Sequence, residues 1–202
     1  MNQVGTEEKI KEAAKQVFLE RGFDGTKMRD IAEVAGINTA LTNYYFRSKE
    51  NLFWIVFDEM LRQSMDQMNQ VLNGDQSIRE KIRQLIQQQY DFHSKNQMLA
   101  LFIMNEIRRD PERFAQRTSL LEMFTHSVFF KQLEEGIAQK QIRPISADHL
   151  LGLMFAHSQQ LYAGKALHLV LFKTDEAGFE AYAKAQVEIA IDMILCYLFI
   201  TN

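Results

Sequence analysis

The sequence TKMRDIAEVAGINTALTNYYF, residues 26–46, decides the fold of this chain. Apolar residues in its first half return at helical spacing, and Gly36 interrupts that pattern before it resumes at Ile37. Asn38 is a favourable N-cap residue, so the second half predicts a helix that begins after it and ends near Phe46. Two short helices joined by a tight, glycine-containing turn are typical of a helix-turn-helix motif.

Another helix is expected in front of this pair, from about residue 6 to residue 21. Its apolar positions recur every three or four residues and form one buried stripe, made of Ile10, Ala13, Ala14, Val17 and Phe18. Gly22 and Gly25 end this helix, and Phe23 between them is an apolar side chain available to the core. The first 48 residues therefore predict a three-helix domain.

The rest of the chain is also expected to be helical. Only 2 prolines and 9 glycines occur in 202 residues, and sheet proteins of this size need more of both for their turns. A β-sandwich, a β-barrel and a doubly wound α/β fold are thus disfavoured. The predicted class is all-α with about nine helices, the last six at residues 49–72, 77–94, 97–109, 112–140, 146–172 and 174–200.

Two domains are predicted, residues 1–48 and residues 49–202, joined by a continuous helix and not by a flexible linker. The net charge of −3 does not indicate a nucleic-acid partner. Its distribution is more informative, because residues 21–49 hold five basic and three acidic side chains. After Arg143 there is no arginine, and three lysines face six acidic residues. The two ends of the chain are expected to meet different partners.

The helix after Asn38 presents small and polar side chains on one arc, which suits entry into the major groove of DNA. An asparagine in this position can pair with adenine, while tyrosines and lysines suit phosphate contacts. Tyr45 is equally compatible with core packing, and Arg29 with a surface ion pair to Glu33. The predicted DNA-contacting residues are Thr26, Lys27, Thr39, Ala40, Asn43, Tyr44, Tyr45 and Lys49.

Residues 6–53 resemble the DNA-binding domain of the TetR family of transcriptional regulators. The matching stretches are Ala14–Phe18 with Gly22-Phe23, residues 26–36, and residues 43–53. The resemblance implies a homodimer of all-helical subunits, a third helix that reads the groove, and a variable C-terminal domain that binds a small ligand. One departure is that Leu41-Thr42-Asn43 stands where many members have Thr-Leu-Tyr, which affects the expected base contacts.

Aromatic residues are dense between residues 90 and 130, and polar side chains lie near them in the sequence. An apolar cavity with a few convergent polar groups is how small-molecule sites are built. A hydrophobic or aromatic effector is the hypothesis, and a bundle core filled by the same aromatics is the alternative. The candidate ligand-binding residues are Tyr90, His93, Phe102, Phe124, Phe129, His157 and Gln160.

The run Met193–Ile200 is apolar on all sides, so it must be buried on more than one side. A second subunit is the natural cover, and the resemblance implies a four-helix bundle formed by the last two helices of each subunit. Cys196 is expected to be an inert, buried thiol. The predicted dimer residues are Leu161, Ile189, Met193, Cys196, Tyr197 and Ile200.

Several classes of site are not expected. A single cysteine excludes an intramolecular disulfide and a cysteine-based zinc site, and no two histidines lie four residues apart, so no metal is predicted. There is no glycine-rich phosphate loop and hence no nucleotide cofactor. The charged N-terminus and the short apolar runs predict a cytoplasmic protein with no membrane segment.

The sequence therefore predicts a ligand-responsive regulator that is not an enzyme. As a homodimer it would repress transcription at a palindromic operator on double-stranded DNA, and a small hydrophobic effector would release it. Two alternatives stay open. One is a constitutive dimeric DNA-binding regulator without a ligand, and the other is an all-helical enzyme, which the lack of a catalytic constellation disfavours.

Overall fold

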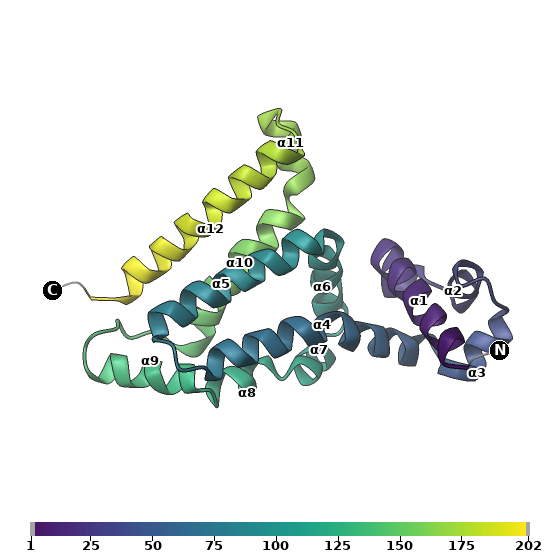
Figure 1. Cartoon of the computed structure of the whole chain (residues 1–202), viewed down its shortest axis with the longest axis horizontal. Helices are drawn as coiled ribbons and strands as arrows, with labels where there is room; N and C mark the ends of the chain where they lie inside the picture. The colour runs from purple at the N-terminus through teal and green to yellow at the C-terminus, as the bar shows by residue number, and fades with distance from the viewer. Residues whose placement is uncertain (1–2, 201–202) are drawn as a thin grey trace. The chain divides into compact units, whose positions relative to one another are not determined.

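The computed structural model describes residues 3–200, and the regular secondary structure of these residues is helical throughout (Figure 1), which confirms the all-α class. One isolated antiparallel bridge pairs Ile142 with Phe199. The helices are α1 (Gln3–Gly25), α2 (Met28–Val34), α3 (Thr39–Phe46), α4 (Lys49–Asn73), α5 (Ile78–Lys95), α6 (Gln97–Arg109), α7 (Pro111–Thr118), α8 (Leu120–Thr125), α9 (Val128–Ala138), α10 (Ala147–Ala163), α11 (Lys165–Phe172) and α12 (Glu176–Leu198).

The chain packs as two compact units. The first holds residues 1–63 and 101–117, and the second holds residues 64–100 and 118–202. Helices α4 and α6 each run from one unit into the other. The predicted continuity of residues 49–72 is confirmed, since α4 ends at Asn73. The predicted domain boundary at residue 48 stays a prediction.

In the first unit, α1 buries the stripe that its sequence predicts, from Ile10 to Phe18. The helix is interrupted at Gly22, whose φ of 68° and ψ of 179° lie in a region open essentially to glycine alone, and it resumes to end at Gly25. The half-buried Phe23 ring packs edge-on against Phe53 of α4, with 5.0 Å between ring centres. The predicted role of Phe23 in the core is thus confirmed.

The helix-turn-helix pair has the predicted signals at its ends. Gly36 adopts a φ of 68° in the turn after α2, which favours glycine. The side-chain oxygen of Asn38 accepts a hydrogen bond of 2.7 Å from the Leu41 amide and so caps α3. Helix α2 begins at Met28, with Lys27 as its N-cap residue.

The second unit is built around α5, α10 and α12, which pack on one another (Figure 1). Its core includes Ile82, Phe129, Leu150, Phe179 and Ile191, contributed by four different helices. Ser77 and Glu80 form a capping box at the start of α5. This helix also buries Lys81 completely, and the Lys81 ammonium donates a hydrogen bond of 3.3 Å to the Leu72 carbonyl near the end of α4.

The predicted long helix over 112–140 is wrong, because α7, α8 and α9 occupy this stretch. The helical conformation is interrupted at Ser119, which has a φ of 44°, and again at Ser127. The Ser127 hydroxyl donates to the Phe124 carbonyl and accepts from the Phe130 amide, at 2.6 and 3.1 Å. Serine side chains that bond to the backbone in this way compete with a continuous helix.

The predicted helix over 146–172 is likewise divided, into α10 and α11 on either side of Gly164. Glycine weakens a helix because it loses more backbone freedom on folding than other residues. The last helix begins at Glu176, not at Thr174, since Asp175 accepts a hydrogen bond from the Gly178 amide. The described residues therefore form twelve helices in place of the nine predicted.

The backbone at Gly22 provides a test of this fold. We expect Gly22→Ala to lower the free energy of unfolding by about 2 kcal/mol, because an alanine there is strained in any surroundings. Gly5→Ala is the matched control. Gly5 is helical with open space around its Cβ position, so its substitution should be neutral or stabilising by up to about 1 kcal/mol. Urea unfolding measures both, and equal effects would contradict the interpretation.

Candidate functional site

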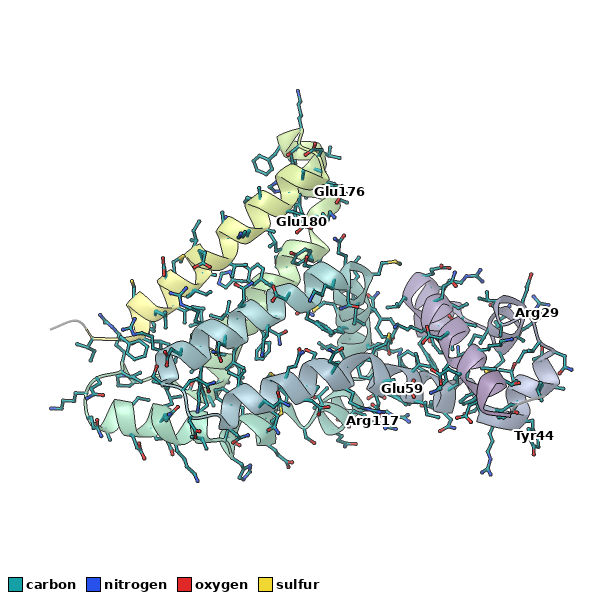
Figure 2. The ribbon with its side chains drawn as sticks, in the orientation of Figure 1. Arg29, Tyr44, Glu59, Arg117, Glu176 and Glu180 are labelled. Atoms are coloured by element: carbon teal, nitrogen blue, oxygen red, sulfur yellow. The ribbon has the colours of Figure 1, made fainter. Side chains whose placement is uncertain are left out.

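Helix α3 presents an exposed face of the kind predicted. Ala40, Asn43 and Tyr44 are exposed and Thr39 is half-buried, while Thr42 on the opposite side is fully buried. The Tyr44 side chain is 74% exposed and extends away from the ribbon (Figure 2). Small and polar side chains, together with the Tyr44 ring, therefore form the accessible surface of α3.

Tyr45 lies between the two roles that its sequence allows. It is half-buried, and its ring centre is 5.6 Å from that of Tyr44 and 6.4 Å from that of Phe46. The ring therefore supports the exposed Tyr44 and also packs toward the core. Its predicted phosphate contact stays a prediction.

Thr26 and Lys49 are held by the protein's own backbone. Thr26 is 1% exposed, and its hydroxyl donates a hydrogen bond of 2.7 Å to the Gly22 carbonyl. The Lys49 ammonium donates to the carbonyls of Phe23 and Thr26, at 2.8 and 3.0 Å. Both side chains therefore fix the α1–α2 turn against α4. That Thr26 and Lys49 also contact DNA phosphates stays a prediction.

Three exposed cations are better placed for a polyanionic partner. Lys27, Arg29 and Arg47 are exposed, and among the described residues none of them forms an ion pair. Arg21 differs, because it lies 3.5 Å from the Asp30 carboxylate. The suggested ion pair of Arg29 with Glu33 is not formed, and the Arg29 side chain points outward (Figure 2).

Arg29 and Arg47 were not among the predicted DNA-contacting residues. Arg47 directly follows α3 and has a φ of 62°, so it leaves the helix in a direction that a helical wheel does not show. Both belong to the surplus of basic residues over 21–49, which was the only feature of the sequence that indicated them. They extend the exposed, positively charged surface that surrounds α3.

A row of arginines on α6 and α7 covers Trp54 of α4. Arg109, Arg113 and Arg117 lie four residues apart, with their guanidinium groups 5.9, 4.8 and 5.4 Å from the Trp54 ring. Arg113 pairs with Glu50, and the guanidinium of Arg117 lies 2.7 Å from the Asp58 carboxylate. These three arginines, called the arginine row below, attach α6 and α7 to the first turns of α4.

Arg109 also reaches the helix-turn-helix domain. Its guanidinium lies 4.1 Å from the centre of the Phe23 ring, and the Lys49 ammonium lies at the same distance. The Arg109 Nε donates a 2.7 Å hydrogen bond to the carboxylate of Glu106, a residue only 2% exposed. Burial raises the pKa of Glu106, and the bond from Arg109 opposes that shift.

The seven predicted ligand-binding residues do not lie in one cavity. Phe102 belongs to the first unit, where its ring lies 5.6 Å from that of Phe53. Phe124 and Phe129 are packed on each other in the core of the second unit. These three aromatic side chains therefore pack in the core, as the alternative in the sequence analysis expects.

His93 is a buried core residue as well. It is 4% exposed, and its Nδ1 lies 3.2 Å from the Ser158 hydroxyl, which joins α5 to α10. Burial lowers the pKa of His93 to about 4, only partly opposed by a hydrogen bond to the backbone at Gln89. His93 is therefore neutral at physiological pH.

The remaining three residues share a hollow. Tyr90, His157 and Gln160 line a pocket of about 510 Å³ between α10, α11 and α12, called the α11 pocket below. A larger hollow of about 1110 Å³, the α10–α12 groove, is walled by the start of α10, the loop before it and the end of α12. Met193 and Tyr197, both predicted dimer residues, lie in its wall.

Four of the six predicted dimer residues lie exposed on α12, whereas Leu161 is a half-buried residue of α10 and Ile200 follows the end of α12. Met193 is 63% exposed, and Ile189, Tyr197 and Ile200 are each at least 43% exposed. Cys196 is exposed on the same helix, so the expectation of a thiol buried within the subunit is wrong. The apolar run divides by helical spacing, because Ile194, Leu195 and Leu198 fill the core instead.

Comparison with known proteins identifies the N-terminal domain. Residues 10–54 match the sequence model of the bacterial regulatory proteins of the tetR family. Residues 10–54 thus form a domain of the TetR family. The curated relatives of the chain are transcriptional regulators and not enzymes, and this chain is likewise a transcriptional regulator. The match covers the helix-turn-helix of α2 and α3.

Two relatives come from Bacillus subtilis strain 168. The probable HTH-type transcriptional regulator YttP is 26% identical over 82% of this chain and 84% of its own length. The fatty acid metabolism regulator protein is 23% identical over 66% of this chain and 69% of its own length.

Solved structures share the fold at lower identity. A tetR-family regulatory protein from Rhodococcus RHA1 has a TM-score of 0.70 at 19% identity, over 94% of this chain and 96% of that one. FadR from Bacillus subtilis, in complex with stearoyl-CoA, has a TM-score of 0.64 at 19% identity, over 91% and 97% of the two chains.

Residues 3–200 show neither a membrane-spanning helix nor a cluster of metal ligands. Within them, no helix is long and apolar enough to cross a membrane. The same residues contain no group of three or more histidine, cysteine, aspartate or glutamate side chains placed to hold a metal ion.

His93 gives the second unit a defined pH dependence. Above about pH 6.5 the side chain is neutral in the folded and the unfolded chain. As the pH falls from about 6.5 to about 4, only the unfolded chain takes up a proton, so the free energy of unfolding falls by about 3 kcal/mol. We expect His93→Gln to remove most of this loss, measured by urea unfolding at pH 7 and pH 4.5. An unchanged loss in the variant would contradict a buried, neutral His93.

Proposed function

We propose that the protein is a homodimeric repressor that binds a palindromic operator and is released by a small hydrophobic effector. The observation that carries this proposal is the exposed face of α3, where Asn43 and Tyr44 stand free beside the unpaired cations Lys27, Arg29 and Arg47. Polar side chains on an accessible helix read base edges, and the cations around them hold phosphates. The predicted contacts of Thr39, Ala40 and Tyr45 belong to the same interface.

The uncovered face of α12 supports a homodimer. Contiguous apolar surface of this kind marks an interaction site in a water-soluble domain. A second copy seated on Met193 and Tyr197 would also fill the adjoining α10–α12 groove. A two-fold pair of subunits carries two recognition helices, which fit successive major grooves of a palindromic site.

The arginine row gives an effector a route to the DNA-binding helices. Helix α6 begins in the second unit and ends in the first at Arg109, on Phe23 and next to the turn that starts α2. A displacement of α6 would therefore strain contacts with Phe23 and Trp54. An effector releases DNA only as far as its affinities for the two arrangements differ.

The names of two relatives support a hydrophobic effector, since one is a fatty acid metabolism regulator and another was solved with stearoyl-CoA. A constitutive dimeric regulator without a ligand is the second candidate. The packing of Phe102, Phe124 and Phe129 as core side chains favours it, because these aromatics then require no ligand. Operator release by a bound compound distinguishes the two.

Selection of bound DNA from a random pool supplies the operator, and Asn43 is then tested on it. We expect Asn43→Ala to reduce discrimination at one base pair of each half-site by about 1–3 kcal/mol, because a bidentate contact to the base is lost. Binding to the selected site and to single-base variants, measured by fluorescence anisotropy, gives this number.

Lys27→Ala is the control for that measurement. Loss of an exposed phosphate-binding cation weakens all sequences alike and lowers the slope of log affinity against log salt by about one. If both variants weaken every sequence equally, Asn43 does not read a base. Failure to select any site from the pool would overturn the DNA-binding proposal itself.

The dimer surface is tested by a charge on α12. We expect the wild-type chain to sediment as a dimer at micromolar concentration and Met193→Glu to sediment as a monomer, because the glutamate would be buried without a partner. Leu121→Glu is the matched control, on an exposed leucine of α8 outside the predicted interface. A monomeric wild-type chain, or dissociation by both variants, would contradict the assignment.

A further inference from the structure

The α11 pocket has the chemistry of an uncharged binding site. Aspartate, glutamate, lysine and arginine are absent from its described lining, which consists of apolar, aromatic, glutamine and histidine side chains. Lys165 and Glu176, at the starts of α11 and α12, pair with each other and do not line it. Glu176 and Glu180 lie on the first turns of α12 (Figure 2), and Glu180 is likewise outside the lining.

One wall of the pocket is a preformed aromatic stack. The His168 ring lies between Tyr182 and Phe172, with ring centres 4.1 and 4.6 Å apart and planes inclined by 26° and 37°. Phe179, which is fully buried, braces the His168 ring edge-on at 5.4 Å. Phe172 is 69% exposed, so the stack is anchored in the core and open toward the solvent. An open stack of this kind offers a planar compound a face to pack on.

The remaining lining supplies a small number of polar groups. Gln160 and His157 of α10 face the pocket together with Gln186 of α12, and Tyr90 of α5 lines it while being 4% exposed. Amides and a phenol donate and accept hydrogen bonds without carrying charge. The volume of about 510 Å³ lies within the range of small-molecule sites and suits a compound of two or three fused rings.

We propose that the α11 pocket is the effector site and that its effector is an uncharged, planar aromatic compound with a polar edge. The rings pack on the stack of His168, Phe172 and Tyr182, and the polar edge bonds to Gln160 and Gln186. This assignment rests on the proposed ligand-responsive function. It adds the location of the effector site and the chemical class of the effector.

The same chemistry disfavours an acyl-CoA in this pocket. Lysine and arginine are the usual side chains that bind phosphate groups, and the described lining contains neither. The larger α10–α12 groove has two predicted dimer residues in its wall, Met193 and Tyr197, whereas the α11 pocket has one, Leu161. The α11 pocket therefore separates this regulator from a relative that binds stearoyl-CoA.

Isothermal titration of the full chain with 2-naphthol, acridone and flavone, and separately with stearoyl-CoA, tests the proposal without DNA. We expect at least one planar compound to bind and stearoyl-CoA not to bind in this pocket. Tyr182→Leu should weaken the planar compound about tenfold, which corresponds to about 1.4 kcal/mol of stacking. Gln160→Ala should weaken it about fivefold. Gln159→Ala, on the neighbouring α10 residue outside the lining, is the control and should leave affinity unchanged.

Three results would overturn the proposal: no planar compound binds, the pocket variants bind as well as wild type, or stearoyl-CoA binds and is weakened by the same variants. Sedimentation and thermal unfolding of each variant are measured in parallel. If Tyr182→Leu and Gln160→Ala dissociate the dimer without affecting ligand affinity, the pocket is filled by the second copy and the proposal fails. Operator binding without ligand is scored separately, so loss of the effector site leaves the DNA-reading proposal standing.

Discussion

The position of the recognition helix depends on one aromatic side chain held between two cations. Phe23 has the Lys49 ammonium and the Arg109 guanidinium each 4.1 Å from its ring centre, and Lys49 also bonds to the carbonyls of Phe23 and Thr26. These contacts close the α1–α2 turn against α4. Since α2 and α3 are connected through the short turn at Gly36, the turn at Phe23 fixes where the exposed face of α3 stands.

The second cation comes from a part of the chain far from the helix-turn-helix in sequence. Arg109 ends α6, and the rest of the arginine row continues through α7 onto Trp54, Glu50 and Asp58 of α4. A cation over an aromatic ring is worth about 0.5–2 kcal/mol, depending on exposure. Each contact is weak enough to be broken by a bound effector, yet together they hold α6 and α7 on the DNA-binding unit. Apolar packing contributes as well, because Phe102 of α6 and Phe114 of α7 lie against Phe53 and Phe57 of α4.

The local signals in the sequence were sufficient for the DNA-binding domain and insufficient for the sensor. Caps at Asn38 and Ser77 and the buried stripe of α1 depend on residues within one or two turns, so they could be predicted. Ser119, Ser127 and Gly164 divide two predicted helices through backbone conformations that composition does not reveal. The arginine row was not predicted either, because its four-residue spacing crosses the gap between α6 and α7 at Asp110 and its partners lie on α4. The lining of the α11 pocket was predicted only in part. Tyr90, His157 and Gln160 were among the predicted ligand-binding residues, but the aromatic stack was not, because its rings meet only where α11 packs on α12.

The dimer surface and the α11 pocket meet at one residue. Leu161 was predicted to contact the second subunit, and it lines the pocket beside Gln160. Leu161 is half-buried, so one part of its side chain can contact a ligand in the pocket and another part a helix of the second copy. A compound that enters the pocket therefore changes the surface on which the second copy packs. Because the spacing of two recognition helices in a dimer is set by that packing, an effector at this position can alter operator binding from within the dimer interface, in addition to any strain carried by α6.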